Sequence, residues 1–203
     1  MIVLGLDTCL GACSVAVLDG PRVLAHASEA MARGHQERLA PMAQAVMAQA
    51  GLGFSDLARV AATVGPGSFT GLRVGVAFAK GLASALSVPA VGVGALEALA
   101  AEEDGLAAAV IDARRDQVYL QVFEAGRALT PPEVAPLEAA VARLAGIAGA
   151  RPFTLVGSGA PLLAASRPGA QVLTPEGCDA RHVARLGARR AVSPLRPLYL
   201  RAP

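Results

Sequence analysis

The hydrophobic residues of the first half of the chain follow two different spacings. Short apolar runs divided by Gly, Asp and Pro residues indicate three strands joined by tight turns, which form an antiparallel meander at the start of the chain. Apolar positions then recur at helical spacing, first before Gly51 and again after a glycine-rich loop at residues 65–71. The expected elements are strands at residues 2–6, 13–18, 22–27, 59–64 and 90–93 and helices at residues 35–50 and 69–86.

The second half opens in the same way as the first. An apolar run ends at Asp112 as the first run ends at Asp7, and in both places a turn and a returning strand follow. Three acidic residues before Gly105 mark a boundary, which predicts an N-terminal lobe at residues 1–104 and a smaller C-terminal lobe at residues 105–203. The pattern favours an α/β fold with mixed sheets. The further expected elements are strands at residues 106–111, 117–123 and 153–156 and helices at residues 137–144 and 181–186.

The composition excludes several classes of protein. Hydrophobic residues make up 54% of the 203 residues and charged residues 17%, so the chain is not disordered. A formal charge of +2 argues against a dedicated nucleic-acid binder, which normally carries a clustered basic surface. The longest uncharged stretch, residues 39–55, contains Pro41, Gln44 and Gln49, so we expect no membrane span.

The cysteines and histidines indicate neither a disulfide framework nor a metal site. Cys9, Cys13 and Cys178 cannot form a closed set of disulfides, and the three histidines lack the spacing of zinc ligands. The chain starts with a strand-like run and shows no secretion signal. We therefore expect a reduced, cytoplasmic protein with small buried thiols, no metal and no cofactor.

The loop at residues 65–71 is the most informative local motif. A strand that leads through a glycine-rich loop into a helix can hold an anion on free backbone N–H groups, here with contacts at Gly67 and Ser68. The residues match neither a phosphate loop, nor a dinucleotide fingerprint, nor a nucleophile elbow. In the alternative interpretation, Ser68 caps the helix and Gly-Pro-Gly forms the turn.

Asp7 and Asp112 are the remaining candidates for chemistry. Each ends the first strand of its lobe, where two aspartates can position a metal–phosphate group between lobes. This interpretation supports a stand-alone ATP-using phosphotransferase. In the alternative interpretation, each side chain stabilises its own β-turn. A peptidase built on Ser68 lacks a recognisable histidine and acid partner in the sequence.

The helix expected at residues 69–86 carries small residues at four-residue spacing. Gly71, Gly75, Ala79 and Ala83 share one face, although a glycine inside a helix costs about 1 kcal/mol relative to alanine. Close approach of another backbone would offset this cost. That backbone belongs either to the first helix of the same chain or to a helix of another chain.

Six segments spread over the chain carry a joint resemblance. They are residues 4–8, 13–17, 35–39 with Pro41, 64–75, 112–119 and 197–201, and residues 65–75 are the most specific part. Together they resemble the TsaB (YeaZ) family, a bacterial subunit of the tRNA threonylcarbamoyladenosine (t6A) machinery. The resemblance implies an actin-like, Hsp70-like (ASKHA) fold, which is a duplicated RNase H-like architecture with a reduced C-terminal lobe.

The resemblance also implies a role as a partner, and not as an enzyme. The related transferase TsaD carries two metal-binding histidines at a stretch that matches residues 93–98, where this chain has none. In the family, TsaB binds and activates TsaD and helps to recruit the ATPase TsaE, so tRNA is expected to be contacted only through the complex. Cys9 and Leu10 depart from the family, whose members usually carry small hydroxyl residues there.

The family's heterodimer forms through the two N-terminal-lobe helices, which correspond to residues 35–50 and 69–86. The same face can form a homodimer when the chain is alone. The expected interface residues are His35, Arg38, Leu39, Met42, Val46, Phe69, Gly71, Leu72, Gly75, Ala79 and Ala83.

Overall fold

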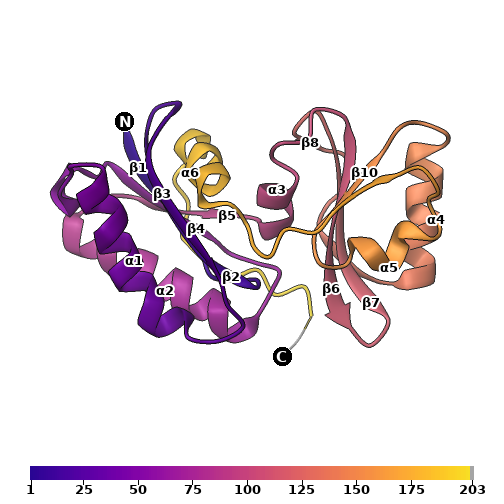
Figure 1. Cartoon of the computed structure of the whole chain (residues 1–203), viewed down its shortest axis with the longest axis horizontal. Coiled ribbons are helices and arrows are strands. Elements are labelled where there is room, and N and C mark those ends of the chain that lie inside the picture. Colours follow the sequence, from indigo (N-terminus) through magenta and orange to yellow (C-terminus); the bar gives the residue numbers. More distant parts are fainter. Residues whose placement is uncertain (202–203) are drawn as a thin grey trace. The chain divides into compact units, whose positions relative to one another are not determined.

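The computed structural model describes residues 1–201 and divides into two compact units (Figure 1). Unit 1 comprises Met1–Ala98 and Gly177–Leu198, and unit 2 comprises Leu99–Glu176 and residues 199–201. Each unit contains one β-sheet that mixes parallel and antiparallel strands. The mixed α/β class expected from the sequence is therefore confirmed.

Unit 1 is built on a five-stranded sheet. Its strands are β1 (Ile2–Asp7), β2 (Ala12–Asp19), β3 (Arg22–Ala30), β4 (Arg59–Thr63) and β5 (Ala90–Val93). They follow the order β3-β2-β1-β4-β5. The first three strands pair antiparallel because short turns join them, whereas β4 and β5 each follow a helical crossover and pair in parallel. All five strands lie where the hydrophobic pattern predicted them.

Helices cover both faces of this sheet. The helix α1 (His35–Gln49) lies beside α2 (Phe69–Leu86) on one face, and α6 (Ala180–Arg189) lies on the other (Figure 1). These three helices were expected from the sequence. The short helix α3 (Ala95–Leu99) and the 3-10 turn η1 (Phe54–Asp56) were not, because so few residues show no helical period.

Small residues of α2 let this helix lie directly on the turn that follows β1. A Cβ atom added to Gly71 would lie 2.0 Å from the Thr8 carbonyl oxygen, and one added to Gly75 would lie 2.6 Å from the Thr8 hydroxyl oxygen. That hydroxyl donates a 2.7 Å hydrogen bond to the carbonyl oxygen of Gly71. The close approach inferred from the sequence is real, but a turn of the same chain makes it, and neither proposed helix does.

The structure corrects the C-terminal boundary of the expected second lobe. Residues 177–198 belong to unit 1, because α6 packs closely on the first sheet. A Cβ atom added to Gly187 would lie 2.3 Å from the Cβ atom of Ala61. Arg59 on β4 also donates a 2.8 Å hydrogen bond to the Gly187 carbonyl oxygen near the end of α6. The chain therefore returns to unit 1 after it completes most of unit 2.

Unit 2 also begins its sheet with an antiparallel hairpin, formed by its first two strands. Its elements are β6 (Leu106–Arg114), β7 (Gln117–Glu124), β8 (Arg127–Ala128), β9 (Glu133–Pro136), β10 (Thr154–Val156), β11 (Gln171–Leu173), α4 (Leu137–Ala148) and α5 (Ala160–Ala164). The sheet order is β11-β10-β6-β7-β8, and β9 pairs with β7. Leu120, Leu144 and Leu155 are fully buried in its core. The sequence pattern did not reveal β8, β9, β11 or α5, which are five residues or shorter.

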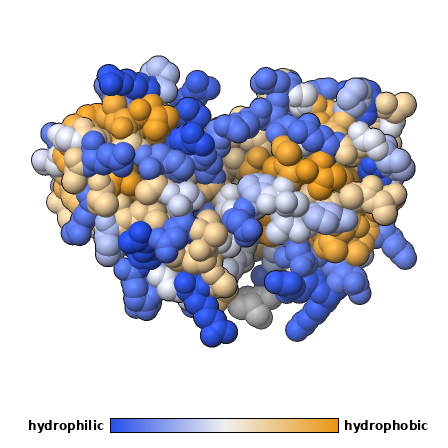
Figure 2. Space-filling view, viewed as in Figure 1, coloured by the Kyte–Doolittle hydropathy of each residue, from blue (hydrophilic) through white to orange (hydrophobic). Residues whose placement is uncertain are grey.

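The surface of both units mixes hydrophilic and hydrophobic side chains (Figure 2). Exposed apolar residues include Phe69 on α2, Leu162 on α5 and Val172 on β11. Among residues 1–201, none of the helices combines the length and the apolar character that a membrane crossing requires.

Gly71 and Gly81 both lie in α2, but only Gly71 is in close contact with another part of the chain. The two glycines therefore give a matched test of the contact between α2 and Thr8. Gly71→Ala pushes a methyl group against the Thr8 carbonyl, so the free energy of unfolding should fall by about 1–3 kcal/mol. In Gly81→Ala, the new methyl group has no neighbouring atom within 4 Å. The better helix propensity of alanine should therefore raise the free energy of unfolding by up to about 1 kcal/mol. Urea denaturation measures both changes, and effects of the same sign would contradict this assignment.

Candidate functional site

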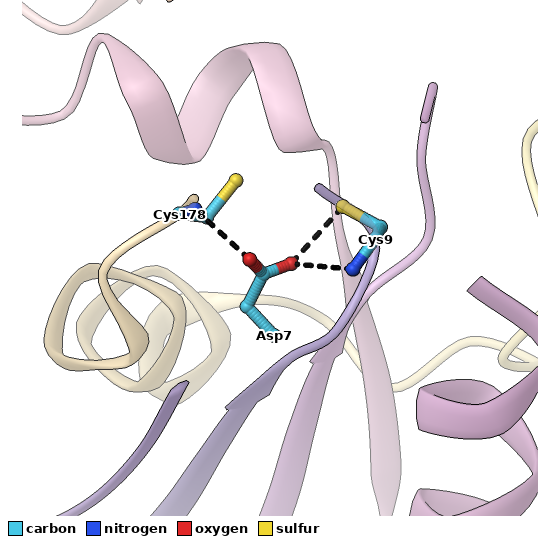
Figure 3. A group of neighbouring side chains, drawn as sticks. All are labelled: Asp7, Cys9 and Cys178. Atoms are coloured by element: carbon cyan, nitrogen blue, oxygen red, sulfur yellow. Dashed lines mark hydrogen bonds between the residues drawn. The ribbon is translucent and has the colours of Figure 1, made fainter. Parts of the chain in front are cut away.

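Asp7 is the centre of a buried hydrogen-bond network at the end of β1 (Figure 3). Its Oδ1 atom accepts hydrogen bonds from the Thr63 hydroxyl at 2.6 Å, the Cys9 thiol at 3.0 Å and the Cys9 N–H group at 3.2 Å. Its Oδ2 atom accepts one from the Cys178 N–H group at 2.9 Å. The carboxyl group thus joins β1, β4 and the segment before α6.

Burial sets the protonation of this network. Loss of water raises the pKa of Asp7 above its ordinary value, and the hydrogen bonds lower it by less. A hydrogen bond with Cys178 lowers the pKa of the Cys9 thiol, but burial and the Asp7 charge outweigh it and the pKa is raised. The hydrogen bond with the Cys9 thiol, together with burial, raises the pKa of the Cys178 thiol well above its ordinary value. Without a bound cation, both thiols are therefore protonated and unreactive near neutral pH.

The glycine-rich loop uses its backbone groups within the chain. The Ser68 N–H group donates a 2.7 Å hydrogen bond to the Cys9 carbonyl oxygen, and a Cβ atom added to Gly67 would lie 2.3 Å from that oxygen. The Ser68 hydroxyl accepts a hydrogen bond from the Gly71 N–H group at 3.3 Å. The capping interpretation of Ser68 is confirmed. The Ser68 N–H group, one of the expected anion contacts, is instead used within the chain, and Gly67 lies against the turn at Cys9.

Asp112 lies in unit 2 and stabilises its own turn. Its Oδ1 atom accepts a 2.7 Å hydrogen bond from the Arg114 N–H group, and its Oδ2 atom pairs with the Arg114 guanidinium at 3.1 Å. Arg114, Arg115 and Asp116 all have a left-handed backbone, which such a side-chain contact helps to hold. The contacts of Asp112 therefore match the interpretation in which the aspartate stabilises its own β-turn. Asp7 also contacts its own turn through Cys9, but it reaches Thr63 on β4 and Cys178 before α6 as well.

A serine, a histidine and an aspartate meet beside the start of α6, a set that the sequence analysis did not single out. The Nε2 atom of His26 lies 3.2 Å from the Ser14 Oγ atom and 3.6 Å from the Asp179 Oδ1 atom. A hydrolytic triad needs the serine and the acid at opposite ring nitrogens, whereas both face the same nitrogen here. Ser14 is buried and also accepts a hydrogen bond from the Ala180 N–H group at 3.1 Å. This cluster fastens α6 to β2 and β3.

A groove of about 540 Å³ opens between α1 and α2 on the outer side of unit 1. The Arg73 guanidinium stacks on the Phe69 ring, with Cζ 3.7 Å from the ring centroid, and 39% of Phe69 is exposed. Exposed aromatic and arginine side chains around an apolar groove are typical of protein–protein contact sites. The lining residues are Gln36, Leu39, Phe69, Thr70, Arg73, Val74, Ala77 and Phe78.

The structure divides the expected interface residues into two groups. Arg38 and Phe69 are exposed, and Leu39 lines the groove although its side chain is almost fully buried. The others are buried within unit 1, and they are His35, Met42, Val46, Gly71, Leu72, Gly75, Ala79 and Ala83. Their burial follows from the apolar helical spacing that singled them out, because this spacing identifies the face that packs inside the unit. The analysis missed Thr70, Arg73 and Ala77, which lie on the opposite face.

Comparisons with known proteins define the class first. The activator of the 2-hydroxyisocaproyl-CoA dehydratase from Clostridium difficile shares the fold, with a TM-score of 0.56 at 11% identity over 92% of this chain and 94% of that chain. Together with the repeated hairpins, this likeness places the chain in the actin-like, Hsp70-like class of two-lobe α/β proteins. The ASKHA fold expected from the sequence is confirmed.

The family follows from nearer relatives. A family model described as "TsaD: tRNA N6-adenosine threonylcarbamoyltransferase" matches residues 24–155. YeaZ from Pseudomonas aeruginosa matches 98% of this chain and 99% of its own, with 32% identity and a TM-score of 0.84. TsaB of Escherichia coli (strain K12) is 39% identical over 129 residues, which are 61% of this chain and 55% of that protein. The chain belongs to the TsaB (YeaZ) family, although its match spans little more than half of this curated relative.

His26 should make the fold less stable in mild acid. Burial lowers the pKa of His26 below its ordinary 6.5, against the Asp179 charge that raises it. The unfolded chain therefore binds a proton at His26 more readily than the folded chain does. The stability that neutral His26 contributes is fully present above about pH 6.5 and is lost as the pH falls below that value. Between about pH 8 and pH 5, the thermal midpoint of the wild type should fall more than that of His26→Asn. Parallel pH profiles would contradict this role.

Proposed function

We propose that this chain is an accessory subunit of the bacterial tRNA threonylcarbamoyladenosine machinery, in which it binds and activates a TsaD-type transferase. Membership of the TsaB family supports this role, since the curated relatives carry the name of that biosynthesis. The match of residues 24–155 to the transferase family model supports descent from a common ancestor. Because this chain and the transferase would then share a fold, α1 and α2 of this chain can associate with the corresponding helices of the transferase.

The groove between α1 and α2 is the observation that carries the proposal. Its rim presents Phe69 and Arg73, while the opposite faces of both helices are buried on the sheet. A partner helix that lies along the groove would cover Phe69 and form polar contacts with Gln36 and Arg73. The sheet behind the helices keeps this surface rigid, which lowers the entropic cost of association.

The chain acts in this proposal without catalysis of its own. Residues 93–98 supply no histidine to hold the metal that the transferase uses, and Asp7 is sealed within unit 1. Recruitment of a TsaE-type ATPase, contact with tRNA through the assembled complex and a cytoplasmic location belong to the same proposal. Within residues 1–201, the contacts of Asp7 and Asp112 stabilise the chain itself and give a stand-alone phosphotransferase no support.

Reconstitution of tRNA threonylcarbamoylation from purified components tests the role directly. Product should form with the transferase, the ATPase, the threonylcarbamoyl-adenylate synthase and this chain, and should be lost when this chain is omitted. The chain alone should hydrolyse no ATP. Equal product with and without the chain would overturn the proposed role, and ATP hydrolysis that Asp7→Asn abolishes would support the phosphotransferase instead.

Variants on the rim of the groove test the docking surface. Arg73→Glu reverses the charge at an exposed contact and removes the stack on Phe69, so affinity for the transferase should fall at least about 30-fold, as for a hot-spot residue. Arg127→Glu, which makes the same change on the exposed strand β8 of unit 2, should leave affinity within about threefold. Calorimetric titration measures both. Equal affinities for both variants would place the interface elsewhere.

A further inference from the structure

Three side chains that carry metal-binding atoms converge inside unit 1. The carboxylate of Asp7 and the thiols of Cys9 and Cys178 lie within 4.8 Å of one another, and all three residues are buried. Figure 3 shows the two thiols on the same side of the carboxylate, one from the turn after β1 and one from the segment before α6. Sequence spacing could not reveal this set, because Asp7 and Cys178 are 171 positions apart.

The donor set has the chemistry of a transition-metal site. Two thiolates favour Zn²⁺ over Mg²⁺ or Ca²⁺, and a carboxylate oxygen is a common further ligand. Within residues 1–201, the groups that contact the Asp7 carboxylate are N–H groups, a hydroxyl and a thiol, and none of them is a cationic side chain. A buried carboxylate is stabilised by a paired cation, which a bound metal would supply.

We propose that Asp7, Cys9 and Cys178 bind a divalent transition-metal ion, with Zn²⁺ as the fitting metal. Tetrahedral zinc holds sulfur and oxygen ligands about 3.3–3.8 Å apart, so shifts of about 1 Å bring the observed atoms into place. The Ala95 carbonyl oxygen, 3.5 Å from the Cys178 Sγ atom, can complete four ligands. This inference concerns unit 1 alone and does not depend on the proposed function.

Neighbouring hydrogen bonds already orient the carboxylate for this role. The Thr63 hydroxyl donates to Oδ1 at 2.6 Å, and the Cys178 N–H group donates to Oδ2 at 2.9 Å. Such outer contacts fix the direction of a metal ligand and typically change affinity about 10- to 100-fold when they are removed. Each thiol gives up its proton to solvent as it coordinates the ion, and no electron transfer takes place.

Binding would clamp the start of the chain to the segment that precedes α6. The ligands come from β1 and its turn on one side and from Cys178 on the other, so the ion would oppose detachment of α6 from the sheet. Because the ligands are buried, the ion must enter while this segment opens or while the chain folds. Metal should therefore raise the thermal midpoint of the full chain.

Cobalt is the probe for the experiment, because Co²⁺ replaces Zn²⁺ and its spectrum reports both sulfur ligation and geometry. The full chain is refolded from urea under reducing conditions, with and without one equivalent of Co²⁺. We expect a thiolate-to-cobalt charge-transfer band, tetrahedral visible bands, and displacement of both by Zn²⁺. Cys9→Ser and Cys178→Ser should lose the bands, and Thr63→Val should weaken Co²⁺ binding about 10- to 100-fold.

Cys13→Ser is the matched control, because Cys13 is also buried but lies outside the cluster. It should keep the full cobalt spectrum. Elemental analysis of the full chain purified without chelator, which needs no refolding, should give close to one zinc per chain, and Cys9→Ser should lack it. Absent cobalt bands in a refolded wild type, a metal-free purified chain, or bands that Cys13→Ser also loses would each overturn the site. A disulfide between Cys9 and Cys178 in the reduced-buffer preparation would do so as well.

Discussion

A buried carboxyl group at the end of β1 constrains much of unit 1. Asp7 is out of contact with water, so its oxygens need donors, and an unpaired buried carboxylate would cost several kcal/mol. The donors come from β4 through Thr63, from the turn through Cys9 and from the segment before α6 through Cys178. Gly177 must lack a side chain for this arrangement, because its Cβ atom would lie 2.8 Å from the Cβ atom of Ala12.

The two residues after Asp7 connect β1 to elements on the other face of the sheet. Thr8 lies against Gly71 and Gly75 of α2, and the Cys9 carbonyl oxygen accepts the Ser68 N–H group from the glycine-rich loop. Three consecutive residues thus hold a strand, two helices and a loop. The groups that could have formed an anion site are used to assemble the unit, which leaves the outer faces of α1 and α2 for contacts with other molecules.

Hydrophobic periodicity predicted the elements of unit 1 well, because its strands and long helices each bury a continuous apolar face. It failed for α5 and β11, whose few residues span too little of either period. The same signal selected residues such as Met42 and Ala79 for the expected interface, and these residues are buried within unit 1. Arg73 carries no such pattern, and only the groove shows its position. Likewise, the meeting of Cys9 with Cys178 depends on tertiary structure that no local spacing encodes.

The return of residues 177–198 to unit 1 has a consequence for synthesis on the ribosome. The face of the first sheet that α6 covers, which includes Gly5 and Ala61, has no cover of its own until the last part of the chain has emerged. At ordinary elongation rates, this interval lasts on the order of ten seconds after β5 is made. During that time the nascent chain exposes an apolar sheet face, so its maturation depends on protection from aggregation until the C-terminal helix arrives.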